Sequence, residues 1–329
     1  MAKKTSQQPD LLPVVNSPIR GALWMMSAGL MLTIMSALMR NLSADLHPFQ
    51  IAFFRSLFGF LFMVPWLFGS GLAVLQTKRF GLHLTRGMIA FVGLLMWTSA
   101  LALIPVAEVT AFSFTAPLFA TFGSALILRE VVRARRWIAV GLGFVGMLIM
   151  LRPGFSDLQP GSLLAVSTAV CIAASMLIVK RLSATEKPGA VVAYMALFLT
   201  LFTAVPALFV WQEFDWVVFG KCVAMGAFGT AGHLCMVRAF AASDASAVAP
   251  FDYARLPFAA LVGFILFAET PDIWTWIGSA VIATSAIYIA QREAASRKKL
   301  NVEIQRDAAA ANLWRDTRSP RKHEIERDA

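Results

Sequence analysis

The sequence predicts an all-α polytopic membrane protein, with ten transmembrane helices arranged as two inverted five-helix repeats. Three observations predict this fold class: an apolar composition, ten apolar runs of membrane-spanning length, and a match between the two halves of the chain. Of the 329 residues, 58% are hydrophobic and 15% are charged, and the mean hydropathy is +0.68. A soluble domain needs a more polar surface, so this composition places the chain in a lipid bilayer.

The ten apolar runs follow one another with short connections. A bilayer core about 30 Å thick takes roughly 20 apolar residues per helix, and a helix satisfies its own backbone polar groups in lipid. The first run follows a polar N-terminus and has no A-x-A-like cleavage site, so we expect it to be retained as a span. The ten expected spans are 20–39, 47–68, 83–104, 106–128, 134–151, 160–179, 189–211, 217–239, 245–268 and 272–290.

A shift of about 140 residues places the second half of the chain on the first. The matches include polar residues and prolines, which apolar composition does not explain. Because each repeat has five spans, the second must enter the bilayer from the opposite side, as in carriers with alternating access. Early matches pair Gly21, Leu23, Ser27, Arg40, Leu42, Ser43, Ala44 and Pro48 with Gly161, Leu163, Ser167, Lys180, Leu182, Ser183, Ala184 and Pro188. Later matches pair Pro117, Gly123, Glu130, Trp137 and Gly141 with Pro257, Gly263, Glu269, Trp274 and Gly278.

The expected organisation has two tails around the repeats. Lysine and arginine are concentrated in alternate connections, which predicts that those connections and both termini are cytoplasmic. Glu130 then lies on the cytoplasmic side and Glu269 on the external side. We expect a bacterial-type cytoplasmic (inner) membrane. The parts are a cytoplasmic N-terminal tail 1–19, a first repeat 20–151, a second repeat 160–290 and a charged cytoplasmic C-terminal tail 291–329.

Several other classes of protein are not supported. The formal charge of +10 comes from residues between apolar runs and in the tails, so we expect lipid contact and no nucleic-acid partner. The three cysteines lack metal-ligand spacing, and no metal or cofactor is expected. The sequence has no HExxH or GxSxG motif, so we expect no enzyme. A GxGxxG pattern at 141–146 lies inside an apolar run and suits close helix packing instead.

Three stretches resemble the EamA-type branch of the drug/metabolite transporter superfamily. They are HPFQIAFFRSLFGF at 47–60, TAPLFATFGSALILRE at 115–130 and RLPFAALVGFILFAETPDIWTWIGSAVIATSAIYI at 255–289. The resemblance covers residues 20–290. Within this branch, the chain is similar to bacterial members that import S-adenosylmethionine or riboflavin. It implies a ten-helix permease with a central cavity between the two halves, which passes a small organic metabolite.

The resemblance leaves the substrate open. A zwitterionic metabolite such as S-adenosylmethionine, taken up by the cell, is the first expectation, riboflavin import the second, and efflux of amino acids or other metabolites the third. A membrane sensor or scaffold without transport activity is the alternative from another class. Direction, coupling ion, oligomeric state, including a homodimer, and the role of the C-terminal tail stay open.

Charged residues inside spans are costly and are therefore candidates for a site. Asp252 and Arg255 are three residues apart, so they share one helical face and can pair. With Tyr253 they could bind the charged ends of a zwitterion. Arg55 could bind a carboxylate or phosphate through its planar fork, although a structural role as a helix anchor is favoured.

Aromatic and titratable residues complete the candidates. Trp97 and Phe112, with Phe114, could stack on a flat ligand, although core packing explains most aromatic residues. Glu108 and His233 are candidates for a proton site. The alternative for Glu108 is a carboxylate at the membrane interface, and the alternative for His233 is a packed, hydrogen-bonded histidine.

Overall fold

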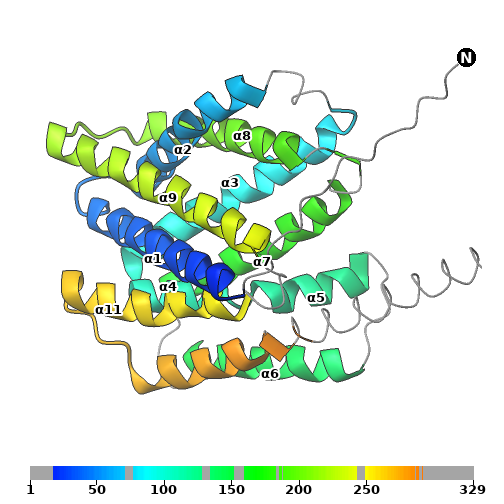
Figure 1. Cartoon of the computed structure of the whole chain (residues 1–329). Coiled ribbons are helices and arrows are strands. Elements are labelled where there is room, and N and C mark those ends of the chain that lie inside the picture. Colours follow the sequence, from blue (N-terminus) through cyan, green and yellow to red (C-terminus); the bar gives the residue numbers. More distant parts are fainter. Residues whose placement is uncertain are drawn as a thin grey trace, which may run out of the picture.

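The computed structural model describes residues 18–70, 77–127, 134–151, 159–182, 185–186, 188–242, 249–285, 287–288 and 291. All regular elements in these ranges are helical, which confirms the predicted all-α class (Figure 1). Residues 1–17 of the N-terminal tail, nearly all of the C-terminal tail and Glu130 lie outside the described residues.

Four of the long helices begin at a proline. In the first repeat these are α1 (Pro18–Leu42) and α2 (Pro48–Ser70), and in the second they are α7 (Pro160–Leu182) and α8 (Pro188–Phe209). Proline lacks an amide hydrogen and has a fixed φ, and both properties suit the first turn of a helix. The first two spans of each repeat therefore begin in the same way.

The third span of each repeat is also a continuous helix. These are α3 (Phe80–Leu103) and α9 (Trp216–Ala242). Asp215 caps the N-terminus of α9, where its Oδ1 accepts a hydrogen bond of 2.8 Å from the amide of Val218. Such a cap satisfies an amide that has no partner within the helix.

The fourth span of each repeat is interrupted. In the first repeat it consists of α4 (Val106–Ser113) and α5 (Ala116–Ile127). In the second it consists of a 3-10 helix, η2 (Ala249–Ala254), followed by α11 (Arg255–Phe267).

A proline lies just after each interruption. Pro117 is in the first turn of α5 and Pro257 in the first turn of α11. Neither can donate the backbone hydrogen bond that would continue the preceding helix, so the sequence breaks both spans at matching places. Broken helices at matching positions of two repeats are typical of secondary transporters.

The last span of each repeat is shorter. It is α6 (Ala134–Leu151) in the first repeat and the helix Ile273–Ser285 in the second, and the two lie side by side in Figure 1. A Cβ added to Gly146 would lie 2.9 Å from the carbonyl oxygen of Gly278, and one added to Gly278 would lie 2.6 Å from that of Gly146. The two backbones therefore touch, which only small residues permit.

The lengths of the helices fit a membrane. Among the described residues, seven helices are long and apolar enough to cross a bilayer, with α4 and α5 counted together as one span. Val140–Met150 within α6 and the helix Ile273–Ser285 are shorter apolar helices. With the η2–α11 span, the ten expected spans are all present.

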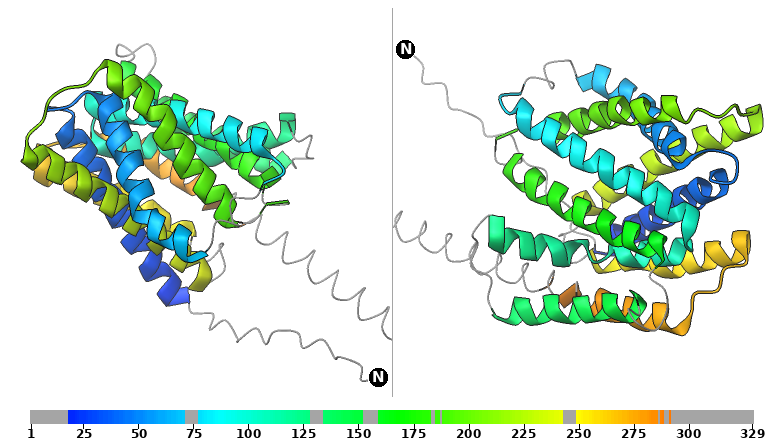
Figure 2. Two further views of the ribbon diagram at one scale, coloured as in Figure 1. Left: turned by 90° about the horizontal axis from the view of Figure 1, so that it is seen from above. Right: turned by 180° about the vertical axis from the view of Figure 1, so that it is seen from behind.

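The first helix of each repeat packs on the third helix of the other repeat. Helix α1 packs on α9, and its equivalent α7 packs on α3, while α2 and α8 pack on each other (Figure 2). One apolar core draws on both repeats and includes Met39, Phe54, Leu101, Phe112, Leu199 and Met225.

The contact of α1 with α9 and the contact of α3 with α7 each include a glycine where the two helices approach closely. A Cβ on Gly232 of α9 would lie 2.8 Å from Cγ of Leu32 in α1, and a Cβ on Gly93 of α3 would lie 2.8 Å from Cβ of Cys171 in α7. A side chain at either glycine would push the two helices apart. The two halves that match in sequence therefore also match in the way their helices pack.

Candidate functional site

The two broken spans meet where α4 ends. The ring of Phe114, which follows α4, lies 4.6 Å from the ring of Tyr253 in η2, measured between centroids. Phe114 is buried and Tyr253 is half-buried. The interruption of each span thus contributes one aromatic ring to a single contact between the repeats.

Asp252 and Arg255 lie beside this pair of rings. Nη1 of Arg255 is 3.8 Å from Oδ2 of Asp252, and its guanidinium carbon is 5.8 Å from the centroid of the Phe114 ring. Oδ1 of Asp252 and Nε of Arg255 are buried and have no hydrogen-bond partner among the described residues. Buried polar atoms are normally paired, so this ion pair retains unused hydrogen-bonding capacity.

Helix α1 leaves room for Arg255. A Cβ added to Gly29 would lie 2.8 Å from Cγ of Arg255. The absence of a side chain at Gly29 therefore lets the stem of Arg255 lie against α1. This contact joins residues that are far apart in the sequence.

Arg55 and His233 lie on two further helices. Arg55 is half-buried within α2 and His233 is exposed within α9, and these helices pack on each other. We call the side chains of Phe114, Asp252, Tyr253 and Arg255 the central cluster.

The remaining residues predicted for the site lie elsewhere. Phe112 is fully buried in the apolar core, and Trp97 is half-buried and packs against that core. Glu108 is half-buried in the first turn of α4. The structure thus brings Asp252, Tyr253 and Arg255 together with Phe114.

Sequence reasoning missed a polar contact between the repeats at one end of the bundle. Nη2 of Arg40, at the end of α1, is 2.5 Å from Oε1 of Glu269, which follows α11. Nη1 of Arg40 also donates hydrogen bonds to the carbonyl oxygens of Leu101 (2.6 Å) and Ile104 (2.7 Å) at the end of α3. Both charged residues appear among the repeat matches, which was the available signal.

A second missed contact lies at the other end of α3. His83 is buried, and its Nε2 is 4.0 Å from Oε2 of Glu186, which lies between α7 and α8. The Tyr194 ring lies 4.6 Å from the His83 ring, measured between centroids. Polar contacts therefore join the two repeats at both ends of the bundle.

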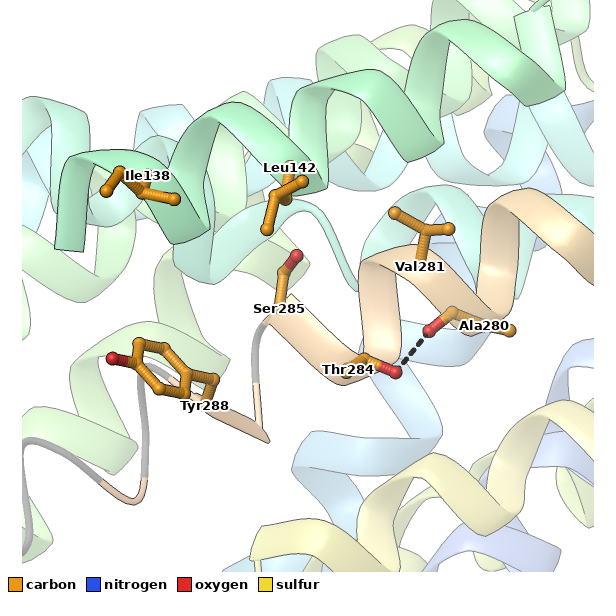
Figure 3. Close-up of a pocket in the computed structure, with 7 residues that line it drawn as sticks. All are labelled: Ile138, Leu142, Ala280, Val281, Thr284, Ser285 and Tyr288. Carbon is orange, nitrogen blue, oxygen red and sulfur yellow. Dashed lines mark hydrogen bonds between the residues drawn. The ribbon is translucent and has the colours of Figure 1, made fainter. Parts of the chain in front are cut away.

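A crevice of about 480 Å³ lies between α6 and the helix Ile273–Ser285 (Figure 3). Its walls are mostly apolar, with Ile138 and Leu142 on one side and Val281 on the other. The hydroxyl of Thr284 donates to the carbonyl of Ala280 at 2.7 Å. No charged residue is among the described residues that line this crevice, so the central cluster is the better candidate for binding a polar solute. In the described part of the chain, no group of three or more His, Cys, Asp or Glu residues could hold a metal ion.

The fold and the cluster define a class of protein, a multi-pass membrane transporter built from two repeats. The sequence profile of the EamA-like transporter family matches residues 19–152 and 159–291, and the chain belongs to this family.

Named relatives include riboflavin transporters and S-adenosylmethionine uptake transporters. A riboflavin transporter of Vibrio cholerae is 35% identical over 300 residues, which cover 88% of this chain and 100% of the relative. An S-adenosylmethionine uptake transporter of Rickettsia felis is 30% identical over 261 residues, which cover 79% of this chain and 89% of the relative. One solved crystal structure shares the fold with a TM-score of 0.56 at 21% identity, covering 84% of this chain and 99% of the other. The expectation of a metabolite transporter related to these two groups is confirmed.

Proposed function

We propose that this protein carries riboflavin, or a closely related flat and uncharged heterocycle, across the cytoplasmic membrane without changing it chemically. The observation that supports this substrate is the central cluster, where a pair of aromatic rings lies beside Arg255 and its partner Asp252. Aromatic faces suit a flat ring system, and guanidinium groups donate hydrogen bonds to ring carbonyls. The riboflavin transporter matched over its full length supports the same substrate.

The charge of the cluster favours an uncharged solute over a cation. Arg255 is cationic, and Asp252 is the one carboxylate in the cluster. S-adenosylmethionine carries one more positive than negative charge, so its extra charge would have no carboxylate partner in a site of low dielectric constant.

S-adenosylmethionine is the second candidate. Asp252 and Arg255 present opposite charges 3.8 Å apart, an arrangement that matches the ammonium and carboxylate of an amino acid. Uptake transporters for this metabolite are among the relatives. In either case, alternating access would come from movement of one repeat against the other around the central cluster.

Purified protein in liposomes tests the substrate. We expect saturable uptake of labelled riboflavin that excess riboflavin abolishes and that S-adenosylmethionine inhibits more weakly. Asp252→Asn and Arg255→Gln should reduce uptake at normal protein levels, because each leaves the other charge unpaired. The matched control is Asp45→Asn, which removes a carboxylate from an exposed ion pair with Lys221. Riboflavin uptake equal to that of empty liposomes would contradict the proposal.

We also propose that both termini and the connections rich in lysine and arginine are cytoplasmic. The distribution of positive charges in the sequence supports this orientation. Labelling of single cysteines introduced at Lys78 and at Gln212 should give opposite accessibilities in intact cells. Equal labelling at the two positions would contradict this topology.

A further inference from the structure

His83, in the first turn of α3, is a buried histidine without a hydrogen bond in the described part of the chain. It is 2% exposed, and neither its Nδ1 nor its Nε2 has a partner among the described residues. A histidine ring carries at least one N–H donor in every protonation state, and buried donors are normally paired. The structure therefore holds an imidazole with unused hydrogen-bonding capacity near one end of the bundle.

The carboxylate of Glu186 faces this imidazole. Its side chain is 5% exposed, and its Oε2 is 4.0 Å from Nε2 of His83, which is longer than a hydrogen bond. Oε1 of Glu186 instead accepts a hydrogen bond of 3.3 Å from the backbone amide of Lys78. The residues Lys78 and Arg79 are themselves exposed. Imidazole and carboxylate are thus close neighbours that are not hydrogen-bonded to each other.

Arg86 places a positive charge on the same face of α3, three residues beyond His83. Its Nη1 donates a hydrogen bond to the carbonyl oxygen of Val191 in α8 (2.8 Å), and its Nε donates one to Oγ of Ser175 in α7 (3.4 Å). Within the described residues, the charges that act on the imidazole are those of Glu186 and Arg86. These two charges balance while the imidazole is neutral.

Tyr194 of α8 packs against the ring of His83. The centroids of the two rings are 4.6 Å apart, and their planes are inclined by 30°. One turn further along α3, a Cβ added to Gly87 would lie 2.7 Å from Cβ of Phe198 in α8. Helix α3 belongs to the first repeat and α8 to the second. The imidazole is therefore packed in a tight interface between the two repeats.

A proton on His83 would disturb the balance of charge in this interface. The imidazolium would be a second cation beside Arg86, and the single carboxylate of Glu186 offsets only one of them. Neither of its N–H groups would have an acceptor within hydrogen-bond distance among the described residues. Such a charge is costly to bury and is stabilised by water. The protonated ring therefore favours separation of α3 from α8.

We propose that His83 is a proton switch that controls the opening of this end of the bundle. The neutral ring keeps α3 packed on α8, and a proton transferred from water to the ring favours the open arrangement. The proposed topology places this end in the cytoplasm, so a fall in cytoplasmic pH favours opening to that side. This inference rests on the proposed movement of the repeats and not on the choice of riboflavin as solute.

Distances between two spin labels test the switch in the full chain, reconstituted in liposomes without solute. The labels are attached to cysteines introduced at the exposed residues Gly81 and Thr185, after the three native cysteines are replaced by alanine. These positions lie on the two sides of the contact between His83 and Glu186. We expect the ratio of long to short distances to rise about tenfold from pH 7.5 to pH 5.5, because a hydrated histidine binds a proton near pH 6.5.

Two variants of the labelled chain show which group binds the proton. His83→Gln keeps a polar side chain that does not titrate, so its distances should not change with pH. The matched control is His47→Gln at the start of α2, which removes a half-buried histidine at the other end of the bundle. This control should keep the tenfold change.

The outcomes separate the switch from the proposed function. Distances that do not change with pH, or that change equally in His83→Gln, would overturn the role of His83. Shorter distances at acid pH would show that the proton tightens the contact and would overturn it as well. Because solute is absent, none of these results depends on riboflavin. A lack of riboflavin uptake would contradict the proposed substrate and leave the switch unaffected.

Discussion

Gly29 in α1 is the residue on which the position of Arg255 depends. The pairing of Asp252 with Arg255 follows from their spacing, and the structure contains that ion pair. The contact between Gly29 and Arg255 could not be predicted, because it depends on how α1 crosses α11. For the same reason, the sequence could not place Phe112 in the core and Phe114 against Tyr253.

Replacing Gly29 by alanine should impair solute binding. The added Cβ would lie 2.8 Å from Cγ of Arg255, so the arginine must move away from the position it has beside Asp252. We expect a KM for uptake raised severalfold and a stability cost of about 1–3 kcal/mol from overpacking. Kinetics in proteoliposomes and thermal unfolding in detergent measure the two effects.

The control for this change is Gly59→Ala. A Cβ at Gly59, one turn beyond Arg55 in α2, would meet no atom within 4 Å. If Gly29→Ala and Gly59→Ala gave the same KM as the original protein, Arg255 would not depend on Gly29.

At the scale of helices, Arg40 and Glu269 connect four elements. Arg40, from α1, donates to carbonyl groups at the C-terminus of α3, while Oε2 of Glu269, after α11, accepts from the amide of Val106 at the N-terminus of α4 (3.3 Å). Each charge thus lies at the helix end that has the opposite partial charge. The guanidinium carbon of Arg40 also lies 5.6 Å from the centroid of the Phe267 ring.

Removing Arg40 should destabilise the protein more than removing the charge of Glu269. Arg40→Gln leaves a largely buried carboxylate and two carbonyl groups without their donor, at a cost of about 3 kcal/mol. Glu269→Gln keeps both hydrogen bonds of Arg40 to α3 and should cost about 1 kcal/mol. Thermal unfolding of the purified variants in detergent gives the comparison.

The matched control is Lys221→Gln, which breaks the exposed pair with Asp45 at 3.7 Å. This change should cost less than about 1 kcal/mol. Equal unfolding temperatures for Arg40→Gln and Lys221→Gln would show that the contact between the repeats adds no stability.

The sequence predicted the helices and missed one contact between them. Apolar length located all ten spans, and Pro117 and Pro257, which the repeat pairs with each other, lie in the two spans that are interrupted. The repeat aligned Arg40 and Glu269 with their counterparts in the other half but gave no reason to pair them with each other. That pairing depends on where the end of α11 lies relative to α1, which is a property of the packed bundle.

At the scale of the whole molecule, the two last spans meet backbone to backbone. Gly278→Ala should destabilise the protein by about 1–3 kcal/mol, because its Cβ would lie 2.6 Å from the carbonyl oxygen of Gly146, a backbone atom that cannot rotate away. Thermal unfolding measures this cost. The matched control is Gly141→Ala in α6, whose Cβ meets nothing within 4 Å and should leave stability unchanged or slightly higher. Equal effects of the two substitutions would contradict the close approach.

The packing of α1 on α9 and of α3 on α7 has a consequence for the origin of the chain. Neither half alone contains the surfaces that these helices cover. An ancestor of half the length could have built this arrangement only as an antiparallel dimer, with one subunit inserted upside down relative to the other. Joining two copies through an odd number of crossings made both orientations permanent in one polypeptide, and each half was then free to acquire side chains, such as Asp252 and Arg255, that its counterpart lacks.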